Sequence, residues 1–169
     1  MRTTTSITSY LALFAAFAVG WSSAEAQQAS DLNGAWLVTS WTSSDGDVNE
    51  NSQRGLFIFT ITRDNGGNYS MMFVPGDQPR SEYSGEQQTD QEKLAAYDSF
   101  IANSGRLTVE GNELTYEAYM AKDTNYMASW GENGATATWE VDGNTLTLMF
   151  TNGFPDGVTG TFRRPGSGN

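Results

Sequence analysis

The chain has 169 residues, no cysteine, no histidine and a formal net charge of −11. Without those two residue types it has no disulfide, no thiolate zinc site and no histidine-activated nucleophile. Phosphate backbones and anionic membranes repel so acidic a chain, which excludes nucleic acid as a partner. No motif in the sequence points to a metal, a cofactor or a catalytic residue.

Residues 1–26 have the features of a secretory signal peptide. Arg2 precedes the apolar run LALFAAFAVGW, which is short for a membrane-spanning helix, and the small-x-small motif AEA follows at 24–26. We therefore expect cleavage after Ala26, export to the periplasm or the extracellular space, and no membrane span after cleavage. Cleavage leaves residues 27–169, or 169 − 26 = 143 residues, the length of a single β-barrel domain.

Turn sequences rich in glycine, asparagine and aspartate recur after residue 44 and separate runs rich in β-branched and aromatic residues. This pattern predicts eight strands, at about 34–44, 54–63, 67–74, 105–110, 113–121, 134–141, 145–152 and 158–164. Eight antiparallel strands joined in sequence close into an up-and-down barrel, which removes exposed edges. A two-sheet sandwich is the alternative architecture.

One segment, TDQEKLAAYDSFIANSG, has helical rather than strand periodicity. Its apolar residues at helical spacing are Leu94, Tyr97, Phe100 and Ile101. Thr89 and Glu92 have the spacing of a capping box at its start. The predicted fold class is thus all-β, with one inserted α-helix at about 90–103. The strand at 54–63 is apolar on both faces, so we expect its outer face to lie under this helix.

The predicted connections alternate between long and tight. The long ones, 45–53, 75–104, 121–133 and 152–157, lie at one end of an up-and-down barrel, and the tight ones, 64–66, 111–112 and 142–144, lie at the other. This asymmetry predicts a cup-shaped barrel with one open end. We expect a small hydrophobic or amphipathic molecule to bind at that end, gated by the long loops and the helix. A packed interior is the alternative.

Strand alternation and the loop sequences assign the ligand-binding residues of this cup. They are Ser40, Phe57, Phe59, Phe73, Tyr116, Met120, Tyr126, Trp130 and Phe150. Trp41 has the opposite parity to Trp36, and we expect it to point outward near the mouth.

Several segments in order resemble the bacterial lipocalin-like domain family over most of residues 33–164. They are GAWLVTSW, GLFIFT with its following Asp-Asn-Gly-Gly turn, QEKLAAYDSFIANSGRLTVEGNELTYEAYMA and DGNTLTL. The resemblance implies a calycin-type β-barrel that binds small hydrophobic molecules.

Lipocalins also share a Gly-x-Trp on the first strand and an arginine on the last, matched here by Gly34, Trp36 and Arg164, with Arg163 as the other candidate. The match implies a barrel floor in which the arginine lies over the tryptophan. Phe162 stands where the family often has a tryptophan, and the family's histidine and proline in the later strand-loop region are absent.

Two other functions stay open. Glu117 and Glu140 are carboxylates available for acid–base chemistry, but strand parity places both on the outer face. Tyr69 or Tyr116, pointing inward, would serve a cyclase or isomerase that uses the same cavity. A protein-binding or inhibitor module of the cell envelope would instead have a packed interior and exposed aromatic residues on its loops.

Overall fold

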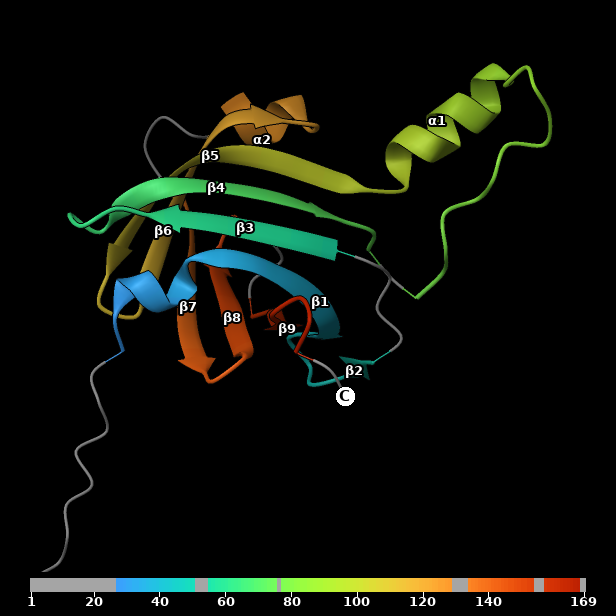
Figure 1. Cartoon of the computed structure of the whole chain (residues 1–169). Helices are drawn as coiled ribbons and strands as arrows, with labels where there is room; N and C mark the ends of the chain where they lie inside the picture. Colours follow the sequence, from blue (N-terminus) through green and yellow to red (C-terminus); the bar gives the residue numbers. More distant parts are fainter. Residues whose placement is uncertain (1–26, 51–54, 76, 129–133, 154–156, 168–169) are drawn as a thin grey trace, which may run out of the picture.

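The computed structural model describes residues 27–50, 55–75, 77–128, 134–153 and 157–167, and its main feature is a closed antiparallel barrel of eight strands (Figure 1). The barrel strands are β1 (Gly34–Thr42), β3 (Gly55–Ile61), β4 (Gly66–Phe73), β5 (Ile101–Glu110), β6 (Glu113–Ala121), β7 (Ala135–Asp142), β8 (Thr145–Asn152) and β9 (Thr159–Arg163). Each pairs with the next, and β1 also pairs with β9. The predicted barrel is therefore confirmed over the sandwich.

Four further elements of the described residues lie outside the eight barrel strands. The 3-10 helix η1 (Ala29–Leu32) precedes β1, and the two-residue strand β2 (Val48–Asn49) pairs with its far end. The helices are α1 (Asp90–Asp98) and α2 (Thr124–Ala128), of which α2 contacts β6. Among the described residues, no helix has both the length and the apolar character needed to cross a membrane.

The helix α1 begins as predicted but ends early. The Thr89 hydroxyl accepts a hydrogen bond from the Glu92 backbone N–H at 3.2 Å, and the Glu92 carboxylate accepts one from the Thr89 backbone N–H at 2.8 Å. The helix ends at Asp98 rather than near 103, because residues 101–104 pair with β4 and extend β5. Backbone pairing along β4 therefore overrides the helical periodicity.

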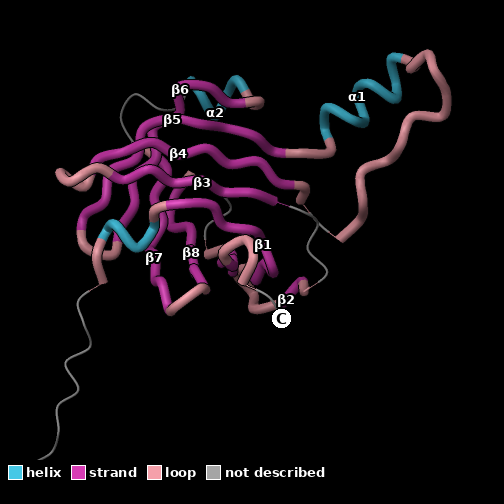
Figure 2. Tube along the Cα trace, viewed as in Figure 1, coloured by secondary structure: helices cyan, strands magenta, loops and turns pink. Residues whose placement is uncertain are grey.

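The expectation that this helix covers the strand at 54–63 is wrong. No residue of α1 is buried, and the helix projects away from the barrel (Figures 1 and 2). Leu56 and Ile58, on the outer face of β3, are 36% and 40% exposed. The inner face of the same strand carries Phe57 and Phe59, both buried.

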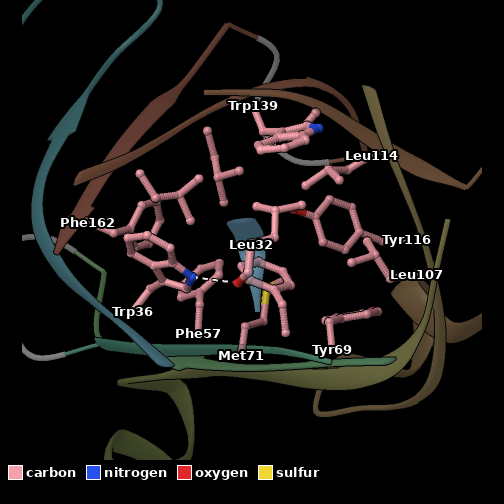
Figure 3. Packing of buried hydrophobic residues seen from close by; sticks show 14 of the residues in the cluster. Leu32, Trp36, Phe57, Tyr69, Met71, Leu107, Leu114, Tyr116, Trp139 and Phe162 are labelled. Atoms are coloured by element: carbon pink, nitrogen blue, oxygen red, sulfur yellow. Dashed lines mark hydrogen bonds between the residues drawn. The ribbon is translucent and has the colours of Figure 1, made fainter. Parts of the chain in front are cut away.

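The core is built from alternate residues of every barrel strand, as the period of two requires (Figure 3). Leu107 and Val109 of β5, Leu114 and Tyr116 of β6, and Ala137 and Trp139 of β7 are all buried on the inner side. Leu146, Leu148 and Phe150 of β8 continue the same face. Large side chains thus fill the part of the barrel interior that lies towards the tight turns.

The end of the barrel with tight turns is closed by the N-terminal segment. Leu32 of η1 is fully buried, and its carbonyl accepts a hydrogen bond from Trp36 Nε1 at 2.8 Å (Figure 3). The Arg164 guanidinium carbon lies 4.1 Å from the centroid of the Trp36 ring. Arg164 also donates to the carbonyls of Asn33 (2.9 Å) and Asp31 (2.7 Å). The guanidinium therefore joins the first strand, the last strand and η1.

Gly34 is required at this floor. Its φ of +111° is one that residues with a side chain rarely adopt, and a Cβ there would lie 3.1 Å from Arg164 Nη1. The structure therefore has the arrangement that Gly34, Trp36 and Arg164 imply, and Arg164 rather than Arg163 is the residue over the indole.

Gln27 fixes the start of the described chain to the same end. Its side-chain amide donates to the carbonyl of Trp139 at 3.1 Å and accepts from the Val141 backbone N–H at 2.8 Å. The side chain thus pairs with β7 as a neighbouring strand would.

Candidate functional site

A cavity of about 530 Å³ lies at the end of the barrel that carries the long connections. Its walls come from the mouth ends of β1, β4, β5 and β6, and from α2. Trp41, Phe73, Phe100 and Tyr126 provide aromatic surface, and Ala121 leaves space between them. A volume of this size suits a small organic molecule.

Trp41 is the largest aromatic group of this wall. Its ring centroid lies 5.0 Å from Phe73, 5.7 Å from Phe162 and 6.3 Å from Phe150. A Cβ at Gly160, the residue opposite Trp41 on β9, would lie 2.8 Å from the indole. Gly160 therefore leaves the room that the indole occupies inside the barrel.

The prediction that Trp41 points outward is wrong, and so is the inward assignment of Ser40. Val38 pairs with Phe162 and Ser40 with Thr161, so Thr39 is an extra residue in a β-bulge. A bulge exchanges the two faces for all residues that follow it. Trp41 therefore faces the interior, opposite Gly160.

A second bulge moves Met120 to the outside. Gly105 pairs with Ala118 and Ser104 with Met120, which leaves Tyr119 as the extra residue. Met120 is consequently 65% exposed, and its assignment to the interior is wrong. Ala121 is buried instead and lines the cavity.

The other residues assigned to the ligand fall into three groups. Phe73 and Tyr126 line the cavity. Phe57, Phe59, Tyr116 and Phe150 are buried in the packed core and are not part of the cavity wall. Trp130 lies outside the described residues. The cavity is thus confined to the mouth.

Two tyrosines meet inside the core. The rings of Tyr69 and Tyr116 are perpendicular, with centroids 5.0 Å apart, and Figure 3 shows both within the barrel. Neither hydroxyl has a hydrogen-bond partner among the described residues. Burial, with a smaller repulsion from Tyr126, raises the pKa of both groups well above the ordinary value. Both hydroxyls therefore stay protonated at neutral pH.

Tyr126 connects this pair to the cavity. It lies on α2 and lines the cavity, and its ionisation at high pH would raise the pKa of both buried tyrosines further. Burial raises the pKa of Tyr126 itself to about 12. The cavity wall therefore has a phenol that stays neutral at neutral pH.

Asn103 is a polar wall residue that the sequence reading missed. It pairs with Met71 on one side and with Ala121 on the other, both of which face inward. Its Oδ1 atom is buried and has no hydrogen-bond partner among the described residues. The alternation of Leu107 and Val109, continued backwards through Gly105, is the signal that could have placed Asn103 on the inner face.

Two features of the described chain decide its fold class. The eight barrel strands follow one another in sequence order, and the pairing of β1 with β9 closes them. Gly34, Trp36 and Arg164 form the floor that lipocalins share. The fold is lipocalin-like.

No protein-family model matches the chain, and no curated protein matches its sequence. Among solved structures, the lipocalin-like barrel is similar to a lipocalin-like protein from Bacteroides uniformis, with 17% identity and a TM-score of 0.47 over 79% of this chain and 98% of that chain. It is also similar to a redesigned β-barrel, mFAP1, bound to DFHBI, with 19% identity and a TM-score of 0.46 over 80% of this chain and 97% of that chain.

Lys122 is an engaged cation at the rim of the lipocalin-like barrel. Lys122 Nζ donates to the Phe100 carbonyl at 2.7 Å and lies 4.4 Å from the centroid of the Tyr97 ring and 4.9 Å from that of Phe100. The Tyr97 hydroxyl donates in turn to the Lys122 carbonyl at 2.7 Å. These contacts hold the C-terminal end of α1 at the mouth, although Leu94 on the same helix stays exposed.

The carboxylates weighed for catalysis lie away from the cavity. Glu117 forms an ion pair with Arg106 across the outer face of β5 and β6, and Glu140 is exposed on β7. Asp123 is the acidic residue that lines the cavity, at its rim and next to Lys122.

Proposed function

We propose that this protein is an exported carrier that binds a small hydrophobic or amphipathic molecule at the barrel mouth. The observation that carries the proposal is the cavity of about 530 Å³ with Trp41 and Phe73 in its wall. Burial of apolar ligand surface against such a wall supplies the binding free energy, at roughly 25 cal/mol per Å². An open cavity also argues against a protein-binding module, for which we predicted a packed interior.

Occluding the cavity tests binding. In Ala121→Phe, a phenyl ring grows from a buried wall position into the cavity. In Met120→Phe, the same ring is placed at the neighbouring exposed position and serves as the matched control. We expect the first variant to lose affinity for alkyl ligands by at least about tenfold, or about 1.4 kcal/mol, while the control retains it. Equal affinities in both variants would contradict the proposal.

The intrinsic fluorescence of the protein reports where the ligand lies. Trp41 lines the cavity, whereas Trp139 is buried in the core and does not. Ligand should therefore change tryptophan emission in the wild type and in Trp139→Phe, and much less in Trp41→Phe. Native mass spectrometry of protein purified from its own host would then identify the bound molecule.

Export is a separate part of the proposal. It is supported by the signal-peptide features of residues 1–26. After expression of the full chain in a bacterial host, we expect the protein in the exported fraction with Gln27 at its N-terminus. An intact leader on cytoplasmic protein would contradict this part while leaving ligand binding untouched.

Catalysis in the same barrel is a second candidate. It is favoured by one observation, the buried hydroxyls of Tyr69 and Tyr116, which lack hydrogen-bond partners among the described residues. Because burial raises the pKa of both groups, each hydroxyl stays protonated at neutral pH and could donate a hydrogen bond to a reacting group, but neither could act as a base. Product formation by the wild type, lost in Tyr116→Phe with binding retained, would support an isomerase or cyclase.

A further inference from the structure

The polar groups within the cavity wall define the chemistry that a ligand must match. Asn103 faces inward from β5 and lines the cavity, with its Oδ1 atom buried and unpartnered among the described residues. Buried acceptors in folded proteins are almost always paired, so each exception calls for a water molecule or a ligand. An asparagine amide offers one acceptor and two donor hydrogens to such a partner.

The layer deeper than Asn103 is polar in the same neutral way. Tyr69 is the next inward residue of β4 from Met71 towards the floor. Its ring packs against that of Tyr116. Both hydroxyls lack partners among the described residues. Tyr126 adds a third phenol, on the cavity wall itself. The packed layer behind the cavity therefore contains neutral hydrogen-bonding groups.

No charged side chain is buried among the residues that the structure describes. Among these residues, two cations lie near the rim, and both are already engaged. Lys122 contacts the Phe100 carbonyl and two aromatic rings, with Asp123 next to it in the chain. Arg80 stacks on the Phe100 ring and donates to Ser99 and to the Ala96 carbonyl. A carboxylate or an ammonium carried to the depth of Asn103 would lose its hydration without gaining a counter-charge. Such desolvation is strongly unfavourable.

We infer that the ligand is an uncharged amphipathic molecule that binds with its polar end inward, where a hydroxyl or carboxamide group pairs with the Asn103 amide. This inference rests on the proposed function, because it concerns the same cavity. The ligand's donor satisfies Asn103 Oδ1, its acceptor receives an Asn103 N–H, and its alkyl or aromatic part lies against Trp41 and Phe73 towards the mouth.

Four probes with the same alkyl chain test this inference: decanol, decanamide, decanoate and decyltrimethylammonium. Their dissociation constants are measured at neutral pH through tryptophan emission and calorimetry. We expect decanol and decanamide to bind at least about tenfold more tightly than either charged probe. Asn103→Leu, which keeps the branching of the side chain but removes its hydrogen-bonding atoms, should abolish that preference. Ser104→Ala, at the neighbouring position that faces the other way, should keep it.

The outcomes separate the inference from the function on which it rests. If no probe binds the wild type, the proposed function fails. If all four bind alike, or if decanoate binds most tightly, the inference is overturned and the proposed function stands. Should Asn103→Leu fail to fold, Asn103→Asp has nearly the same shape. It should shift the preference towards decyltrimethylammonium by at least about tenfold, and an unchanged ranking would overturn the inference.

Discussion

Replacement of Trp36 by alanine should destabilise the barrel far more than it changes what the mouth binds. The indole is fully buried at the closed end, and truncation of a buried tryptophan to alanine costs about 3–5 kcal/mol. The variant also loses the hydrogen bond from Nε1 to the Leu32 carbonyl and the stacking of Arg164, each worth about 1 kcal/mol. Because such terms are not additive, we expect a total loss of about 4 kcal/mol.

Urea unfolding followed by far-UV circular dichroism measures this loss. Trp36→Phe should lose about 1–2 kcal/mol, since it keeps an aromatic ring but not the hydrogen bond, and it remains usable if the alanine variant does not fold. Arg164→Ala should also destabilise the protein. The matched control, Arg163→Ala, removes an exposed neighbour and should change the free energy of unfolding by less than about 0.5 kcal/mol.

The contrary pattern would refute this account of the floor. A loss below about 1 kcal/mol in Trp36→Ala would mean that the indole does not support the closed end. The difference between the binding free energies of decanol and decanoate should also stay nearly unchanged. If that difference changes by more than the free energy of unfolding does, Trp36 belongs to the binding site.

Three further predictions concern the mouth, the buried phenols and the helix cap. Gly160→Ala places a Cβ 2.7 Å from the Phe162 ring and 2.8 Å from Trp41. Urea unfolding should therefore show that the free energy of unfolding falls by about 1–3 kcal/mol. An unchanged midpoint would contradict the close packing of Trp41 against Gly160. Burial raises the pKa of Tyr126 to about 12, so as pH rises the unfolded chain loses the phenol proton before the folded chain does. The free energy of unfolding should therefore fall as pH rises from about 10 to 12. Urea unfolding at each pH should show a smaller fall in Tyr126→Phe than in the wild type, and equal falls would rule out this contribution of Tyr126. Hydrogen bonds from Ser84 and Thr89 to its carboxylate lower the pKa of Glu92 to about 2. The contribution of Glu92 to the helix cap is therefore present above about pH 4.5 and lost as pH falls towards 2. NMR titration should place the Glu92 midpoint well below those of other exposed glutamates, and a midpoint near about 4 would count against these hydrogen bonds.

The barrel could be predicted from the sequence because turn residues and strand periodicity act locally. All eight predicted strands are present. The contact between Trp36 and Arg164 could also be predicted, because the first and last strands are neighbours in a closed barrel. The helix boundary was less accessible, because the pairing of residues 101–104 with β4 depends on a partner that local periodicity does not reveal.

The cavity wall was predicted less well because inward and outward positions depend on an unbroken count along each strand. One extra residue, Thr39, brings Trp41 inside and places Ser40 outside. Another, Tyr119, does the same for Ala121 and Met120. Nothing in the sequence marks either bulge with a glycine or a proline at the extra residue itself. The cavity at the end with the long connections could thus be predicted, whereas most of its wall could not.

The anchoring of Gln27 also sets the direction in which the molecule faces when it is held by its N-terminus. The Gln27 amide is pinned to β7 at the closed end, and α1 and the mouth lie at the opposite end (Figure 1). Any tether, tag or surface joined before Gln27 therefore lies behind the floor and leaves the cavity pointing away from it. If the cavity binds decanol as we propose, protein immobilised through its N-terminus should bind it as tightly as protein in solution, whereas attachment near α1 should weaken binding.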